Sequence, residues 1–347
     1  MKVCESIFER IVSPENLFAA WDEFSKGKQA RGDVRTFAWR LEQNIFALHR
    51  ALVSGAYRHG PYSAFTICDP KQRRIHKAMV RDRIVHHAVF AVLNPLFEPS
   101  FIAQSFSCRV GKGTHRAVDA LERMLRKVSR NGTGPCFALK CDVLQFFASV
   151  DHAVLLEILR RRISDERAVA LLTEIVDSFA GEHQTKGVPI GNLTSQLFAN
   201  IYLNEFDQFM KHELKIKPFI RYTDDFVVVS ESEEFLRCLV QPVENFLRER
   251  LRLTLHPHKV TIRKYRQGID FLGYVLLPHC RVVRTKTKRR MLRKLKSRVV
   301  ECLAGARPWE SVEASLQSYL GVLSHASTYR LTQYFVNQYW FWLTRWP

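Results

Sequence analysis

Two adjacent aspartates, Asp224 and Asp225, stand between two short apolar stretches at residues 218–222 and 226–229. This pattern predicts a β-hairpin with the two aspartates at its turn. Two like charges on a rigid turn repel each other unless a cation lies between them, and Mg²⁺ binds carboxylate oxygens. Asp is also common in ordinary turns, because it tolerates turn geometry. The run alone therefore leaves a metal site and a plain turn about equally open.

A third carboxylate, Asp142, ends a second predicted strand. Larger apolar residues alternate with other residues through 136–142, which is the period of a half-buried strand. A helix is predicted at residues 152–162, with Asp151 as its N-cap. Alone, Asp142 would be interpreted as a turn or capping residue. Beside the Asp-Asp hairpin it would complete a three-carboxylate site, which can hold two metal ions about 3.5–4 Å apart.

Four segments stand in the order and at the spacings of motifs A, B, C and E of reverse transcriptases, and the chain resembles that family. The segments are Asp142 with Phe147 five residues later, residues 189–196 (Pro-Ile-Gly-Asn-Leu-Thr-Ser-Gln), Tyr222-Thr223-Asp224-Asp225, and Phe271-Leu272-Gly273-Tyr274. Upstream, residues 70–75, 81–88 and 104–114 resemble the fingers of the same family. One Asp-Asp pair is a weak signal, whereas this ordered set is a strong one.

The resemblance implies an α+β fold, a right-hand polymerase with fingers, a palm built as an antiparallel sheet packed on helices, and a helical thumb. It divides the chain into an N-terminal helical extension, fingers, palm and basic thumb, at residues 1–60, 61–135, 136–275 and 276–347. Part of the fingers is expected as an insertion near residues 152–186. Apolar residues at helical spacing support helices in the first and the last segment.

The resemblance further implies an RNA-directed DNA polymerase that uses two Mg²⁺ ions, with Mn²⁺ as an alternative. Asp142, Asp224 and Asp225 would hold the ions. Lys259, in a segment similar to motif D, would be the general acid for the leaving pyrophosphate. Phe147 would be a steric gate against the 2′-hydroxyl, although neighbouring Phe146 leaves the register open. The other residues expected at the incoming nucleotide are Lys71 and Arg73 for the triphosphate, with Ile190, Gly191, Gln196 and Tyr222.

Two residues of the motif B segment indicate a subfamily. Most reverse transcriptases have Gln at the position of Ile190 and Pro at that of Gln196, and this chain therefore resembles the enzymes of diversity-generating retroelements. Gln can donate and accept hydrogen bonds, whereas Ile can only pack. The resemblance implies an error-prone enzyme that misincorporates mainly opposite template adenines, for mutagenic retrohoming. The alternative is that Ile190 is a local core residue.

The chain carries 53 Lys and Arg against 34 Asp and Glu, a net charge of +19, which favours a polyanionic partner. Residues 281–298 contain ten Lys or Arg and no acid. Within this run Leu292, Leu295 and Val299 form a helical apolar stripe, which leaves the basic residues on the other faces. A solvated helix face or a localisation signal would show the same charge run. The residues expected to contact nucleic acid are Phe271, Leu272, Gly273 and Tyr274, a primer grip, and Arg289, Arg290, Arg293 and Lys294.

The expected partners are a template RNA, a DNA or RNA primer, and deoxynucleoside triphosphates. The retroelement family adds a small, basic, multimeric accessory protein. The eight cysteines have no zinc-finger spacing and are typical of reduced thiols. No apolar run is long enough for a membrane span. These features predict a cytoplasmic protein, and the resemblance to retroelement enzymes implies a bacterial one, encoded by a bacterium or by its phage.

Two groups of alternatives remain open. The first is a group II intron-like, retron or antiviral-defence reverse transcriptase, which has no reason to err at one template base. The second is an RNA-binding maturase or scaffold with an idle polymerase fold. The complete set of three aspartates argues against the second alternative, because a binding module gains nothing from like charges held together.

Overall fold

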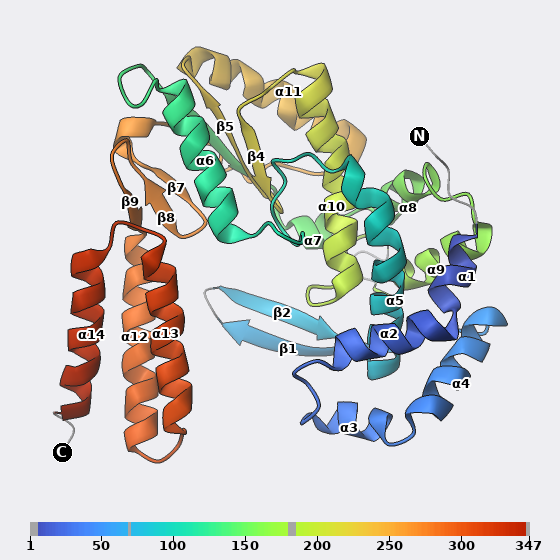
Figure 1. Cartoon of the computed structure of the whole chain (residues 1–347). Coiled ribbons are helices and arrows are strands. Elements are labelled where there is room, and N and C mark those ends of the chain that lie inside the picture. Colours follow the sequence, from blue (N-terminus) through green and yellow to red (C-terminus); the bar gives the residue numbers. More distant parts are fainter. Residues whose placement is uncertain (1–5, 69–70, 180–184, 345–347) are drawn as a thin grey trace.

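The computed structural model describes residues 6–68, 71–179 and 185–344. Its elements (Figure 1) are, in chain order, α1 (Ile7–Val12), α2 (Pro14–Ser25), α3 (Gly32–Ala38), α4 (Leu41–Val53), β1 (Ser63–Cys68), β2 (Gln72–Lys77), α5 (Val80–Phe97), η1 (Glu98–Ser100), α6 (Thr114–Val128), β3 (Phe137–Asp142), α7 (Phe146–Ser149), α8 (His152–Arg160), α9 (Glu166–Asp177), α10 (Leu193–Gln208), η2 (Phe209–Glu213), β4 (Phe219–Tyr222), β5 (Asp225–Ser230), α11 (Glu233–Leu251), β6 (Thr261–Lys264), η3 (Tyr265–Gln267), β7 (Ile269–Phe271), β8 (Tyr274–Leu276), β9 (Arg281–Val283), α12 (Thr285–Leu303), α13 (Trp309–Ser324) and α14 (Tyr329–Thr344). Among the helices in these ranges, none is both long and apolar enough to cross a bilayer.

The central element is a four-stranded antiparallel sheet in the order β4-β5-β3-β6. Successive side chains of a strand point to opposite faces. Along β5, Phe226 and Val228 therefore enter one hydrophobic core, and Val227 and Val229 enter a second core. α10 and α11 supply the first core, and α6 packs against the opposite face. The predicted antiparallel palm on helices is confirmed.

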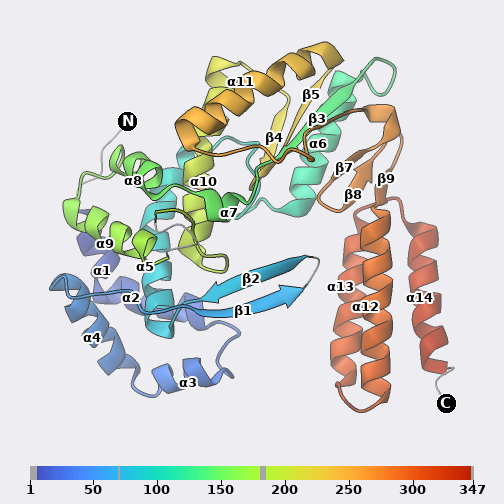
Figure 2. The same ribbon diagram turned by 180° about the vertical axis from the view of Figure 1, so that it is seen from behind.

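The N-terminal helices pack into the first core. α1 and α2 bury apolar side chains against α5, and α4 packs against α1 and α2, as the helical pattern in the first 60 residues predicted. The β1–β2 hairpin, in contrast, is mostly exposed and projects from these helices toward the C-terminal helices (Figure 2).

Helix α6 precedes residue 135, where the palm was expected to begin, but it packs against the palm sheet. α6 contacts β4 and β5, and its buried Val118, Leu121 and Leu125 belong to the core behind the sheet. α6 therefore packs on the palm sheet, although it lies in the range expected for the fingers. Its strong helical pattern gave no information on which layer it would join. Helices α8 and α9 lie in the expected insertion and contact α10 and α1, respectively; residues 180–184 of that insertion lie outside the described residues.

A small antiparallel sheet, β7-β8-β9, joins the palm to the three helices of the thumb (Figure 1). Met291, Leu295 and Val299 of α12 face the helices α13 and α14 in the second core. The predicted stripe contained Leu292 in place of Met291, and Leu292 is only half-buried. Arg281 of β9 holds this unit to α6 through ion pairs with Asp119 (2.6 Å) and Glu122.

Candidate active site

The Asp-Asp hairpin forms as predicted, with a turn one residue earlier in its register. Tyr222 pairs with Asp225, so Thr223 and Asp224 make the turn and Asp225 begins β5. Thr223 has φ 54°, which is unfavourable for a β-branched residue. Its hydroxyl donates to Ser107 Oγ at 2.6 Å, and its carbonyl accepts from Arg221 Nη1 at 3.1 Å. Neighbouring side chains thus hold the strained turn in place.

Arg221 anchors this turn to the helix behind the sheet. Its guanidinium is buried and binds both carboxylate oxygens of Asp207 on α10, at 2.7 and 2.5 Å. A bidentate pair fixes orientation as well as distance. The segment that contains Ser107 also adds to the edge of β4, where Phe106 N donates to the Arg221 carbonyl at 3.0 Å.

Asp142 ends β3 and lies directly opposite Asp225 in the β3–β5 register. Each of these two carboxylates has a lysine partner. Lys259 Nζ lies 2.6 Å from Asp142 Oδ1, and Lys140 Nζ lies 3.3 Å from Asp225 Oδ2. The first contact brings Lys259, the residue expected as general acid, into an ion pair with a carboxylate of the site.

Burial and like charge shape the protonation of the carboxylates. Burial, followed by the charge of Asp142, raises the pKa of Asp224 to about 6. Burial also raises the pKa of Asp225, while Lys140 opposes that shift. The Oδ1 atom of Asp225 is buried and has no hydrogen-bond partner in the described part of the chain. Such a group is costly unless a cation or a donor reaches it.

These residues fit a divalent cation, although no metal cage is preformed. Among the described residues, no three His, Cys, Asp or Glu side chains gather closely enough to hold an ion by themselves. Mg²⁺ rarely uses such cages, because it is bound through one or two carboxylates together with water and substrate phosphates. The unpartnered Asp225 oxygen and the raised pKa of Asp224 are the features that a cation would relieve.

The two phenylalanines of the motif A loop have different environments. Phe146 is 1% exposed in the first core, whereas Phe147 is half-buried at the start of α7. The Phe147 carbonyl accepts from Val188 N at 2.7 Å, which joins this loop to the segment that leads to Ile190. The ring that remains partly accessible is thus Phe147, the predicted gate.

The motif B segment lies against the fingers hairpin. The Ile190 carbonyl accepts from His76 N of β2 at 3.1 Å, and the Ile190 side chain is half-buried. Gly191 has φ 122°, and a Cβ there would lie 3.0 Å from Ile75 Cγ2, so this close approach favours glycine. Lys71 and Arg73 lie on the same hairpin and are exposed.

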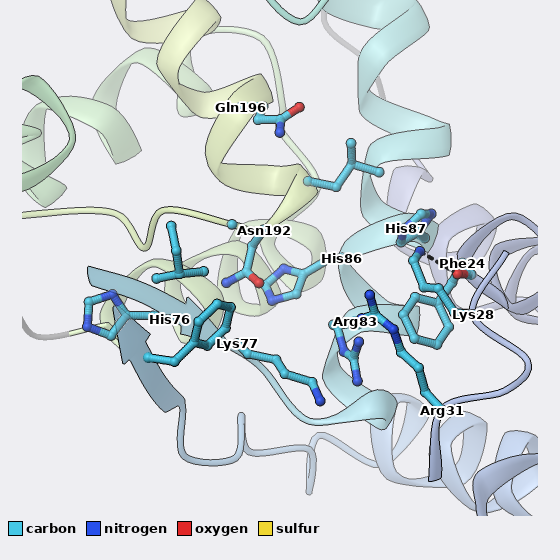
Figure 3. A pocket seen from close by; sticks show the side chains of 14 residues that line it. Phe24, Lys28, Arg31, His76, Lys77, Arg83, His86, His87, Asn192 and Gln196 are labelled. Carbon is cyan, nitrogen blue, oxygen red and sulfur yellow. Dashed lines mark hydrogen bonds between the residues drawn. The ribbon is translucent and has the colours of Figure 1, made fainter. Parts of the chain in front are cut away.

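A basic pocket of about 320 Å³ opens beside this segment, where Gly191, Asn192 and Gln196 line one wall (Figure 3). Burial, followed by the charges of Arg83 and Arg31, lowers the pKa of Lys28 on the facing wall. The Nδ2 atom of Asn192 is buried without a hydrogen-bond partner in the described part of the chain. Crowded cations and an unused amide donor are suited to an anion that also carries acceptors.

The expected primer grip is corrected in part. Phe271 and Tyr274 are buried in the second core, and the Tyr274 hydroxyl donates to the Val322 carbonyl at 2.9 Å. The sequence analysis expected their side chains to contact a primer, but buried side chains cannot do so directly. The turn between β7 and β8, formed by Leu272 and Gly273, is the part left to do so. The alternation of aromatic residues showed a hairpin but not which of its faces would be covered by the thumb.

The basic run folds into α12 as predicted. Arg289 and Arg293 are exposed, and Arg290 and Lys294 are half-buried. The half-buried Tyr222, expected at the nucleotide, has its hydroxyl 3.2 Å from Thr114 Oγ1 of α6.

Sequence reasoning missed Lys140, the Arg221–Asp207 pair and Ser107. Lys140 could have been found, because it stands two residues before Asp142 and a strand places such residues on one face. The other contacts join residues 14 and 116 positions apart, and no local pattern predicts them.

A palm sheet that presents carboxylates at the end of β3 and at the β4–β5 turn, between a fingers hairpin and a helical thumb, defines a right-hand polymerase. Residues 69–276 match the family model described as reverse transcriptase (RNA-dependent DNA polymerase), and the chain belongs to that family of RNA-directed DNA polymerases.

The chain is also similar to three curated proteins. Protein YkfC of Escherichia coli (strain K12) is 28% identical over 280 residues, which cover 69% of this chain and 72% of that protein. The group II intron-encoded protein LtrA of Lactococcus lactis subsp. cremoris is 22% identical over 79% of this chain and 57% of its own length. The mitochondrial nuclear intron maturase 2 of Arabidopsis thaliana is 21% identical over 55% of this chain and 33% of its own length.

Proposed function

We propose that this reverse transcriptase extends a DNA or RNA primer along an RNA template at Asp142, Asp224 and Asp225. The observation that carries the proposal is the β3–β5 register, which sets Asp142 opposite Asp225 beside the Asp224 turn. Two bound Mg²⁺ ions would activate the primer hydroxyl and neutralise charge on the leaving oxygen. Primer extension on a defined RNA tests the proposal. A chain that binds RNA but makes no product would favour the maturase or scaffold with an idle polymerase fold.

The other residues would position the nucleotide. Lys71 and Arg73 on the exposed hairpin would hold the triphosphate, and Phe147 would occupy the space that a 2′-hydroxyl needs. Lys259 would leave Asp142 and protonate the pyrophosphate. The basic pocket beside Gly191 would accept a phosphate.

For the subfamily, we assign the chain to the diversity-generating retroelements, on the basis of Ile190 and Gln196 in the motif B segment. The names of the relatives favour a second candidate, a group II intron-like enzyme. Mutagenic retrohoming requires errors concentrated at one template base, and an intron-like enzyme has no such requirement. The error spectrum therefore separates the two candidates.

We expect Ile190→Gln to lower misincorporation opposite template adenine by several-fold, because Gln restores a donor and an acceptor worth one or two hydrogen bonds. Errors opposite the other three bases should change less. Overall activity should survive, since Lys71 and Arg73 are untouched. Deep sequencing of cDNA copied by both enzymes from one template measures the effect.

Ile75→Gln is the matched control for that variant, since Ile75 lies on β2 against Gly191 and is partly buried. It should not change the preference for errors at adenine. If the wild-type error rate at adenine equals that at guanine, cytosine and uracil, the retroelement assignment fails and the intron-like candidate remains.

The proposed partners are a template RNA and a small basic multimeric accessory protein, as in the retroelement family. Bacterial relatives support a place of action in a bacterial cytoplasm. The basic helix α12 would supply phosphate contacts of the polymerase itself.

Neutralising Arg289, Arg290, Arg293 and Lys294 together to Gln should weaken RNA–DNA duplex binding about uniformly across sequences. The log–log salt slope should fall by roughly one unit for each lost phosphate contact. Fluorescence anisotropy over a salt series measures it. Neutralising Arg237, Arg248 and Arg250 of α11, on the opposite face of the sheet, is the control. Equal slopes for wild type and the α12 variant would show that this helix is only a solvated face.

A further inference from the structure

Lys140 contacts Asp225 on one side and strand β7 on the other. The roles assigned above use neither contact. Its Nζ atom lies 3.3 Å from Asp225 Oδ2 and 3.2 Å from the main-chain oxygen of Asp270 in β7. It also lies 6.0 Å from the centre of the Phe271 ring. Lys140 pairs with Val227 in the β3–β5 register, and so it faces the same side as Asp142 and Asp225.

The contacts continue from Asp270 to the thumb. The Asp270 carboxylate forms an ion pair with Arg284, the residue that immediately precedes α12. The main-chain N–H of Arg284 donates to the Gly273 carbonyl, in the β7–β8 turn, at 2.9 Å. A continuous series of polar contacts thus runs from Asp225 through Lys140 and Asp270 to Arg284, the N-cap of α12.

We propose that Lys140 is a positioning residue that sets Asp225 against the β7–β8 hairpin and, through Asp270 and Arg284, against the thumb. The proposal rests on the proposed function of the site. By occupying Oδ2, Lys140 leaves the buried and unpartnered Oδ1 of Asp225 as the oxygen free for a cation. The same ammonium holds the hairpin whose turn would border the primer, so the carboxylate and the expected primer support would move as one unit.

This arrangement has a specific cost. Lys140 is a positive charge beside the carboxylate that must bind a second cation, and like charges at such distances repel. A residue that only filled space would not affect metal affinity in this way. Lys140 therefore weakens metal binding while it improves the placement of the primer end.

The test compares Lys140→Met and Lys140→Arg in the full chain. Lys140→Met should reach half-maximal extension at several-fold lower Mg²⁺, because the competing charge is gone. Its kcat should fall by about 10- to 100-fold, since the primer end is misplaced, while KM for the deoxynucleotide changes little. Lys140→Arg keeps the charge and should retain the wild-type Mg²⁺ requirement with a partial recovery of kcat.

A second readout does not depend on activity. Thermal unfolding at increasing Mg²⁺, without nucleic acid or nucleotide, should show stabilisation of Lys140→Met at lower Mg²⁺ than wild type. Lys264→Met is the matched control, because Lys264 lies on neighbouring β6, over the Phe137 ring, in the same sheet. An unchanged kcat, or an unchanged Mg²⁺ midpoint in thermal unfolding, overturns the inference. A wild-type chain that extends no primer contradicts the proposed function instead, and the unfolding experiment still tests Lys140.

Discussion

Asp224→Asn is expected to reduce primer extension by about 10³-fold or more, because metal-assisted charge stabilisation is worth several kcal/mol. Asparagine keeps the shape of the turn residue and removes the charge that attracts Mg²⁺. Binding of RNA should remain close to wild type, since the substitution removes none of the basic side chains of α12. Single-nucleotide extension under saturating substrate, together with RNA-binding anisotropy, measures both properties.

The same variant has an opposite effect on stability. The pKa of Asp224 is raised from 3.8 to about 6 by burial and by Asp142. Its charged form is therefore disfavoured in the folded chain, so the free energy of unfolding without metal falls as pH rises from about 4 through about 6. At pH 8, Asp224→Asn should raise that free energy by about 1–3 kcal/mol, since one pKa unit is worth 1.36 kcal/mol.

Asp22→Asn provides the control, because Asp22 is exposed on α2 and remote from the palm sheet. It should change neither extension nor the pH dependence of unfolding. Near-normal extension by Asp224→Asn would end the assignment of the metal site. If wild type and Asp224→Asn show the same pH dependence of the free energy of unfolding between pH 4 and 8, the burial of the Asp224 charge is contradicted.

Phe147→Ala should raise the use of ribonucleotides relative to deoxynucleotides by about 10²-fold, because the space for a 2′-hydroxyl opens. Use of deoxynucleotides should fall less, since the sugar loses only a packing contact. Competing extension with each nucleotide type, read as the ratio of kcat/KM values, measures the discrimination.

Phe146→Leu distinguishes a gate from a general packing effect. Phe146 is fully buried beside Phe147, with ring centres 5.4 Å apart. The variant should lower stability and leave sugar discrimination unchanged. If discrimination is lost in Phe146→Leu and kept in Phe147→Ala, the gate has been assigned to the wrong ring.

Local sequence patterns predicted the secondary-structure elements that carry the site. The hairpin of Asp224 and Asp225, the strand that ends at Asp142 and the helical thumb all follow from the spacing of apolar residues within a few positions. The burial of Phe271 and Tyr274 and the place of α6 do not, because they depend on which layer packs on the hairpin or the sheet. The lysine partners of Asp142 and Asp225 come from different distances in sequence. Lys140 shares a strand with Asp142, whereas Lys259 arrives from a loop 117 residues away.

The division of β5 between two hydrophobic cores has a consequence for how the molecule can vary. A slip of one residue in the β3–β5 pairing would exchange the side chains of both cores at once. Both cores therefore fix the register of this pairing, and Asp142 stays opposite Asp225 as long as either core keeps its shape. Replacements in the N-terminal helices and in the thumb can then accumulate separately, without changing the distance between the carboxylates. Such a sheet permits a family whose members differ most at their two ends and share a constant centre.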